Sequence, residues 1–143
     1  LVAGRAGAKI ANVRPPLPPQ TWTPTFKDGV TNIGHTLNYA TYVQIDGLIH
    51  IRCSVTRNDA GVLTGTLNLG GFPLPLATGV SHAACGNAWI DNAANDITAL
   101  VYIDGANGNL LQTETVGTKI MTTDQWENGR HIYWAATYMA AGA

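Results

Sequence analysis

The chain has 143 residues and a formal net charge of −1, with 12% charged and 45% hydrophobic residues. A typical globular domain carries about 25% charged residues, so we expect a surface that is neutral and polar or partly buried in an oligomer. The eight Lys and Arg residues are scattered, which argues against nucleic acid as a partner because phosphate binding needs clustered basic groups. No long apolar run or basic amphipathic stretch is present, so the sequence predicts no membrane insertion.

Residues 1–20 differ in kind from the rest and are predicted to form a linker or the end of a stalk. Leu1 to Lys9 is rich in Ala and Gly, and Val13 to Gln20 holds four of the seven prolines. Proline fixes φ and removes a donor, so an extended, stiff polyproline-II connector is expected. A Pro-rich ligand for a peptide-binding domain is the alternative. Because the chain starts at Leu1 without a Met, we expect it to be a piece of a longer protein.

Residues 21–143 are predicted to form one all-β domain, and the clearest element is a hairpin around Asp46-Gly47. Asp-Gly between alternating runs is typical of a type I′ turn, which needs positive φ at both central positions. In the strand that follows, alternation places Ile49, Ile51, Cys53 and Val55 on one face, and His50, Arg52, Ser54 and Thr56 on the other. Cys53 is therefore predicted to be a buried free thiol, since two cysteines are no dense disulfide framework.

The middle of the chain alternates weaker strands with turn-rich loops. Pro73 and Pro75 cannot donate to a central ladder, so the segment around them should be irregular. In chain order we expect a weak strand from Val62 to Leu69, an irregular segment from Gly70 to Pro75, a strand from Ala88 to Ile90, a loop from Asn92 to Asp96, a strand from Ile97 to Ile103, a hairpin tip from Asp104 to Asn109, a strand from Leu110 to Thr115 and a polar loop from Thr122 to Gly129.

The last predicted strand, from Arg130 to Met139, is apolar on both faces. One face carries Trp134 and Tyr138, and the other carries Tyr133 and Met139. A strand that is apolar on both faces is usually buried twice, which predicts one contact with the core and one with another subunit. Many short strands at this spacing predict an antiparallel β-sandwich, jelly-roll-like and oligomeric. The residues assigned to a trimer interface are Tyr133, Trp134, Tyr138, Phe72 and Pro73.

The sequence favours no catalytic or metal chemistry. Most of the acids lie beside Gly, Asn or Ala in turns, where hairpin geometry explains Asp46 and Asp104, and the two serines lack a nucleophile-elbow motif. Two His-x-x-Cys spacings offer a nominal zinc set, but His50 and Cys53 would point to opposite faces of a strand. His82 and Cys85 meet no such objection, and chance occurrence is the better account of the spacing. We therefore predict no enzyme activity, no cofactor and no metal. An ion ringed by one His or Asp from each chain of a trimer is left open.

A sugar site pairs an aromatic face with polar groups for the hydroxyls. Trp126 has that company in the polar loop from Thr123 to Asn128, although a Trp folded back over the core edge is the alternative. Trp22, Trp89 and Trp134 are assigned to the core or to an interface. The predicted glycan-binding residues are Trp126, Asp124, Asn92, Asn95, Asp96, Asn107 and Asn109.

Three short motifs occur in a fixed order. They are Thr21-Trp22-Thr23-Pro24, the Gly-bearing hairpin from Tyr42 to Arg52, and the segment from Leu69 to Leu76. In this succession, from about Thr21 to Tyr138, the chain resembles the C-terminal domains of bacteriophage tail fibres and tailspikes. In that family a Gly-Leu-Pro-Phe-like turn sits mid-domain. Here the turn reads Gly71-Phe72-Pro73-Leu74, so the aromatic residue and the Leu exchange places.

The resemblance implies a homotrimer at the distal tip of a fibre, joined to an upstream stalk and made in the bacterial cytoplasm. It implies non-enzymatic recognition of a host-surface glycan or protein. Three alternatives stay open at this stage. They are a monomeric carbohydrate-binding module of a secreted bacterial enzyme, a trimerisation cap without a ligand, and a glycan hydrolase.

Overall fold

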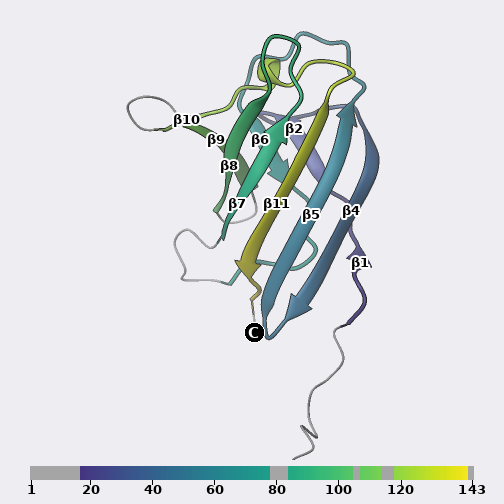
Figure 1. The fold of residues 1–143 in the computed structure, drawn as a ribbon, viewed down its shortest axis with the longest axis vertical. Helices are drawn as coiled ribbons and strands as arrows, with labels where there is room; N and C mark the ends of the chain where they lie inside the picture. The colour runs from purple at the N-terminus through teal and green to yellow at the C-terminus, as the bar shows by residue number, and fades with distance from the viewer. Residues whose placement is uncertain (1–16, 78–83, 105–106, 114–117, 142–143) are drawn as a thin grey trace, which may run out of the picture.

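The computed structural model describes residues 17–77, 84–104, 107–113 and 118–141. Within these residues the protein is almost entirely β, and its strands pair antiparallel in the order β1-β4-β5-β11-β7-β8-β9-β6-β2-β3, with β10 beside β9 (Figure 1). The strands are β1 (Gln20–Thr21), β2 (Thr25–Asp28), β3 (Thr31–Asn32), β4 (His35–Ile45), β5 (Leu48–Arg57), β6 (Leu67–Gly70), β7 (Ala84–Ile90), β8 (Ile97–Asp104), β9 (Asn107–Thr113), β10 (Thr118–Ile120) and β11 (His131–Met139).

The sheet bends over on itself and encloses the core between two layers. In Figure 1, β4, β5, β11 and β7 form a broad sheet towards the viewer, while β2 and β6 lie behind it. Aromatic side chains meet between the layers: Phe26 of β2 packs 5.2 Å from Trp126, and Trp22 packs 5.7 Å from Trp134, measured between ring centroids. The predicted antiparallel sandwich is confirmed at this level.

The hairpin at Asp46-Gly47 is confirmed. Asp46 and Gly47 have φ of 47° and 83°, and Ile45 pairs with Leu48 across the turn. In β5, Ile49, Ile51, Cys53 and Val55 are all buried. Cys53 is a free, buried thiol, and His50 points to the opposite, exposed face. Alternation along β5 was therefore predicted correctly from sequence.

Strand β11 keeps the predicted alternation, but the structure corrects its assigned role. Trp134 and Tyr138 are buried within the chain's own core. Burial of so much apolar area stabilises the subunit itself, so neither side chain is free to form a trimer interface. The other face of β11, which includes Tyr133 and Met139, stays exposed. Only this face has apolar surface left to offer a partner.

Two of the three sequence motifs pack against each other at one end of the core. Gly71 has a φ of 73°, and a Cβ placed there would clash with the carbonyl oxygen of Thr23. The next residue, Phe72, then reaches Trp22 and Trp134, with 6.3 Å between ring centroids in each case. Tyr138 donates its hydroxyl to the carbonyl of Leu74 at 2.9 Å. Segment 71–77 thus closes the sandwich, and its irregularity was predicted correctly.

Other boundaries differ from the prediction. Residues 62–65 form no strand, and Thr66 makes a single bridge to Thr122 before β6 begins at Leu67. A hairpin of β2 and β3 around Gly29, which has a φ of 59°, was missed because each strand is so short. Strand β7 is longer than expected and begins at Ala84. The N-terminal stretch 1–16 and hairpin residues 105–106 lie outside the described residues.

The two ends of the sheet path carry the shortest strands in it. β1 and β3 have two residues each. The register joins Gln20 of β1 to Tyr42 and Thr21 to Thr41. The chain thus enters the domain along the edge of β4, beside the broad sheet.

Candidate functional site

The loops at one end of the sandwich contain most of the residues predicted to bind a glycan, and Trp126 is the first correction. Its side chain is 0% exposed, and its indole Nε1 donates to the carbonyl of Arg130 at 2.9 Å. A stacking platform needs an accessible ring face. Trp126 anchors the loop to Phe26 instead, as the alternative interpretation of this residue anticipated.

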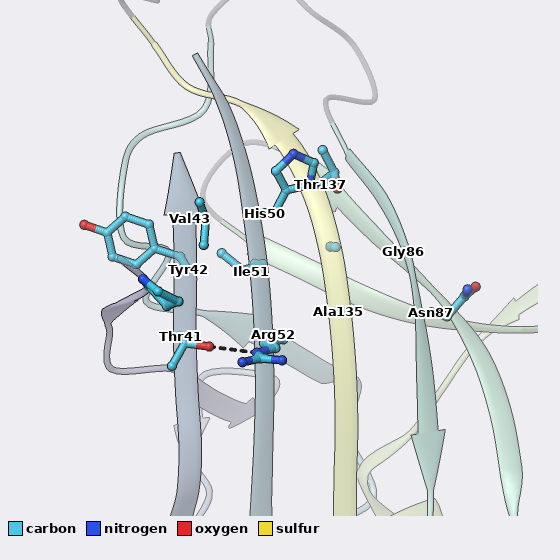
Figure 2. A pocket seen from close by; sticks show the side chains of 12 residues that line it. Thr41, Tyr42, Val43, His50, Ile51, Arg52, Gly86, Asn87, Ala135 and Thr137 are labelled. Carbon is cyan, nitrogen blue, oxygen red and sulfur yellow. Dashed lines mark hydrogen bonds between the residues drawn. The ribbon is translucent and has the colours of Figure 1, made fainter. Parts of the chain in front are cut away.

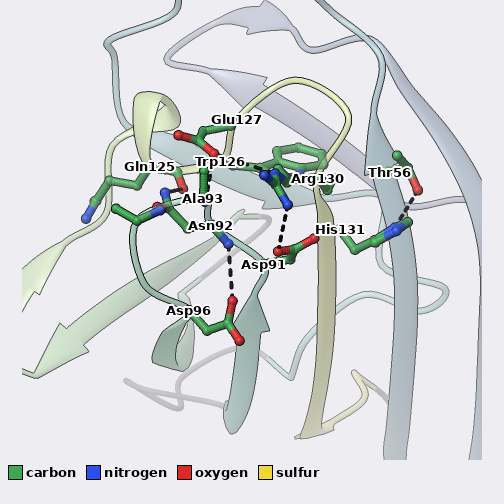
Figure 3. A network of polar contacts seen from close by, with 11 residues as sticks. Thr56, Asp91, Asn92, Ala93, Asp96, Gln125, Trp126, Glu127, Arg130 and His131 are labelled. Carbon is green, nitrogen blue, oxygen red and sulfur yellow. Dashed lines mark hydrogen bonds and ion pairs between the residues drawn. The ribbon is translucent and has the colours of Figure 1, made fainter.

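The structure does bring Asn92 and Asp96 close to the segment that holds Asp124, but hydrogen bonds within the loops occupy most of their polar groups (Figure 3). The amide nitrogen of Asn92 donates to the carbonyl of Gln125 at 3.0 Å, and its Oδ1 accepts from the backbone of Ala94 at 3.0 Å. Asp96 accepts from the backbone N–H of Asn92 at 3.4 Å. These hydrogen bonds fix the loop. Of the predicted glycan-binding residues in these loops, only Asn95 and Asp124 are exposed and have no partner among the described residues.

Charged groups in the same loops are also paired with each other. Arg130 lies 3.3 Å from Asp91 and 3.7 Å from Glu127, and Glu127 also accepts from the backbone N–H of Ala93 at 2.9 Å (Figure 3). The network ties the loop after β7 to the loop before β11. Its geometry is that of a structural brace.

Asn107 and Asn109 belong to strand β9, not to a loop, and lie away from these residues. Asn107 pairs with Asp104 at the far end of β8, whereas the 92–96 loop precedes Ile97 at its near end. A strand rises about 3.3 Å per residue, so the two ends of β8 are roughly 23 Å apart. The predicted glycan site therefore does not assemble as a single cluster.

A different surface combines exposed aromatic and polar groups: the outer face of the broad sheet. Ala135 lies at its centre, paired with Arg52 of β5 on one side and with Asn87 of β7 on the other. In the next outward-facing row, two residues earlier on β11, Tyr133 pairs with Ser54 of β5 on one side and with Trp89 of β7 on the other. The outward residues of these two rows are Tyr39, Ser54, Tyr133, Trp89 and Thr98 in one, and Thr41, Arg52, Ala135, Asn87 and Leu100 in the other.

Two shallow hollows lie on this face and meet over Ala135. One, of about 540 Å³, extends towards His50 and Thr137 (Figure 2). The other, of about 530 Å³, extends towards Trp89 and Tyr133. Arg52, Asn87 and Ala135 line both hollows. The hollow at the centre arises because Ala135 carries a single methyl group between the longer side chains of Arg52 and Asn87.

The close approach of β7 to β11 holds this arrangement. A Cβ on Gly86 would clash with the carbonyl oxygen of Ala135 and with the Cα of Ala136. Gly is required in a strand where another backbone comes this near. Asn87 is thereby held beside Ala135 on the outer face, from which Figure 2 shows it extending.

Aromatic side chains border the second hollow and keep much of their surface. Trp89 and Tyr133 are each 38% exposed, and Tyr39 is 43% exposed. The rings of Trp89 and Tyr133 lie 5.3 Å apart and are tilted by 40°. The Arg52 guanidinium lies 5.9 Å from the centroid of the Tyr39 ring, a cation–π distance. The hollow thus has aromatic walls and a cation at its edge.

Arg52 and Arg57 occupy the same strand but have opposite environments. Arg57 is buried, with Nη1 donating to the carbonyl of Trp126 at 2.5 Å and Nη2 to that of Gly61 at 2.7 Å. Arg52 is exposed, and only its Nε donates, to the Thr41 hydroxyl at 3.0 Å (Figure 2). Within the described part of the chain, the terminal nitrogens of Arg52 have no hydrogen-bond or ion-pair partner.

Cys53 lies on the reverse side of the sheet and offers no nucleophile to this face. Burial raises the pKa of the Cys53 thiol to about 12, and the nearby Trp134 side chain offsets only a smaller part of this rise. Among the described residues, no group of three His, Cys, Asp or Glu side chains could hold a metal. No helix in that part of the chain is long and apolar enough to cross a membrane.

Sequence reasoning missed Arg52, Asn87 and Trp89 as members of one site. The outward direction of Arg52 and of Tyr133 could be read from alternation. Their proximity could not, because β5, β11 and β7 are far apart in the chain and their register is visible only in the folded sheet.

Comparison with known protein families, with curated proteins and with solved structures finds no match to this chain.

Proposed function

We propose that this chain is the C-terminal domain of a bacteriophage tail fibre or tailspike, which trimerises and recognises a host-surface glycan or protein without enzymatic activity. The observation that carries the proposal is the hollow over Ala135, where exposed aromatic rings lie beside Arg52, whose terminal nitrogens have no partner among the described residues. Ligand sites combine apolar walls with a few polar groups in this way. In this proposal the protein is part of the virion, at the tail tip, and is made in the bacterial cytoplasm.

The resemblance to tail-fibre domains gains support from the packing of its motifs. Trp22 and Pro24 of the opening motif are buried, and Gly71 of the mid-domain turn packs against the backbone around them. Motifs that meet in space act as one structural unit. They are consistent with a jelly-roll-like sandwich that follows a Pro-rich linker and stalk.

For the trimer contact, we favour one end of the outer face. Ile45, Leu48 and Met139 are neighbours in the sheet register, and each is more than a third exposed. The backbone N–H of Ala140 donates to the carbonyl of Gly47 at 2.9 Å and holds the end of β11 against the turn. A contiguous apolar patch of this kind suits a second copy of the same chain. Phe72 and Pro73 are half-buried and remain secondary candidates.

The test combines mass with adsorption. Light scattering should give about three times the 15.1 kDa of one chain, and a fluorescently labelled fragment should bind the surface of at least one strain in a panel of bacteria. Three weak sites on one rigid head raise the apparent affinity through effective concentration. A monomer that binds no bacterial surface would contradict the proposal.

Two other functions use parts of the same structure. A monomeric carbohydrate-binding module would also use the aromatic hollow, and a monomeric mass with intact glycan binding would support it. A trimerisation cap without a ligand would keep the apolar patch alone. In that case the trimer would form, and substitutions in the hollow would leave adsorption unchanged.

A further inference from the structure

We infer that the hollow over Ala135 binds an acidic saccharide, with a sugar carboxylate on Arg52 and the pyranose ring against Trp89 and Tyr133. This inference rests on the proposed function and specifies its ligand. It depends on three features of the outer face: which polar groups are already paired, which charges are present, and where the aromatic surface lies.

Among the described residues, polar groups on the outer face are paired on both sides of a central row formed by Thr41, Arg52, Ala135, Asn87 and Leu100. Within that row the one side-chain hydrogen bond described joins the Nε of Arg52 to the Thr41 hydroxyl. Towards the loops, Asn38 donates to Ser54 and to Thr56, both at 3.1 Å, and Thr56 also bonds His131 at 2.7 Å. Towards the turn, His50 bonds Thr137 at 2.9 Å.

In the central row between them, the terminal nitrogens of Arg52 and the side-chain amide of Asn87 have no partner within the described structure. A guanidinium carries five donors in a fixed fork, so four N–H groups of Arg52 are available. Both side chains are exposed, so these groups face solvent and are available to a ligand.

The charge of the face selects the kind of ligand. Arg52 is the fixed charge in the centre, and no Asp or Glu projects outward from the described side chains of β4, β5, β7, β8 or β11. Asp91 and Glu127, the acids in the adjoining loops, are paired with Arg130. A carboxylate on the ligand therefore meets no repulsion and forms a charge-assisted, bidentate pair with the guanidinium.

The aromatic groups select a sugar over a free carboxylate. An exposed ion pair contributes little to affinity, so the remaining affinity must come from apolar contact. Trp89 and Tyr133 supply it next to Arg52, because Tyr133 lies opposite Ser54, two residues along β5. Tyr39 supports the guanidinium from the other side. The apolar C–H face of a pyranose fits the rings, while its hydroxyls reach Asn87.

A glycan-binding array with matched ligands tests this inference. The array carries fragments of bacterial surface polysaccharides that contain uronic or sialic acids, the same fragments after carboxyl reduction to neutral sugars, and phosphorylated fragments. The proteins are the wild type, Arg52→Gln, Trp89→Ala and the control Arg130→Gln, which removes an arginine outside the hollow. Added salt should weaken binding of the acidic fragments, because it screens the attraction between Arg52 and the sugar carboxylate.

We expect acidic fragments to bind about tenfold more tightly than their reduced forms, and both Arg52→Gln and Trp89→Ala to lose about tenfold. Arg130→Gln should bind as the wild type does. Equal binding of reduced fragments, binding of phosphorylated fragments alone, unchanged binding by Arg52→Gln, or no bound fragment at all would overturn the inference. Light scattering and cell adsorption on the same samples separate the two proposals. A trimer that adsorbs to bacteria but ignores carboxylates would keep the proposed function and reject this ligand.

Discussion

The two faces of β11 have similar sequences and different fates. Trp134 and Tyr138 on the inner face are buried by the chain itself, whereas Tyr133 and Met139 on the outer face are more than a third exposed. Both sets are apolar, so hydrophobicity alone does not assign them. What separates them is the second layer: β2, β6 and segment 71–77 cover one face and leave the other open. The inner face therefore determines stability, and the outer face is available for recognition.

The largest expected effect comes from breaking the inner face. Trp134→Ala should lower the free energy of unfolding by about 3–5 kcal/mol, because it leaves a cavity where the indole packs against Trp22 and Phe72. Tyr133→Ala, one residue earlier and on the outer face, should change it by less than about 1 kcal/mol. Urea unfolding of both variants makes the comparison. Equal losses in the two variants would show that the outer face is also buried in solution.

The closure of the inner face is tested at Gly71. Gly71→Ala should lower the free energy of unfolding by about 2–4 kcal/mol, since it combines a left-handed backbone with a clash against Thr23. Gly29→Ala is the matched control, because Gly29 also has positive φ but no atom near a new Cβ. It should cost about 1 kcal/mol. A similar loss at both positions would mean that segment 71–77 adapts to the added methyl group.

The inner face also predicts a pH dependence. The pKa of Cys53 is about 12 in the folded protein against 9.0 for a free thiol. Above pH 9 the unfolded chain loses this proton while the folded chain keeps it, so stability falls as pH rises and the loss levels off near pH 12. At pH 10 the loss is about 1.4 kcal/mol.

The variant Cys53→Ala isolates the thiol and should flatten the alkaline slope between pH 8 and pH 10. Burial also raises the pKa of Tyr138, which acts in the same direction at higher pH. Tyr138→Phe removes that second contribution while leaving the thiol. Urea unfolding at a series of pH values measures the slope of stability against pH. Identical slopes for the wild type and Cys53→Ala would contradict the assignment of the alkaline loss to the Cys53 thiol.

The smallest effect on stability is expected at the apolar end of the outer face. Leu48→Lys should change the free energy of unfolding by less than about 0.5 kcal/mol but shift the mass from trimer to monomer, because a charge would be buried at the contact. Val62→Lys, at an exposed residue outside the sheet, is the control and should leave the mass unchanged. A trimer that survives Leu48→Lys would move the interface elsewhere.

Local patterns in the sequence predicted local structure well. The turn at Asp46-Gly47 and the alternation in β5 and β11 follow from rules that act over a few residues. Cys53 was predicted to be buried for the same reason. Trp126 shows the limit, because a polar neighbourhood in sequence does not reveal that a ring turns inward against Phe26.

The candidate site depended on information that the sequence does not carry locally. Arg52, Ala135 and Asn87 come from three strands whose adjacency is fixed by sheet topology. Because β11 is apolar on both faces, the sequence predicted one contact with the core and one with another subunit. It did not indicate which face the second layer would cover. The predicted loop residues failed as a single site because β9 begins at Asn107, and because Asn92 is used by the loop itself.

The short strands at both ends of the sheet path bear on how much of the sheet edge stays open to another chain. A long open edge offers unpaired backbone groups to another chain and invites fibrous aggregation, which many proteins oppose with charged side chains. With 12% charged residues, this chain has few to spare for that purpose. β1 has two residues and pairs only with Tyr42 and Thr41 of the eleven-residue β4, so most of the β4 edge has no partner strand within the described residues. The β4 edge is therefore where another extended chain could add to the sheet, and covering it with a longer β1 by design should make the protein less prone to gel.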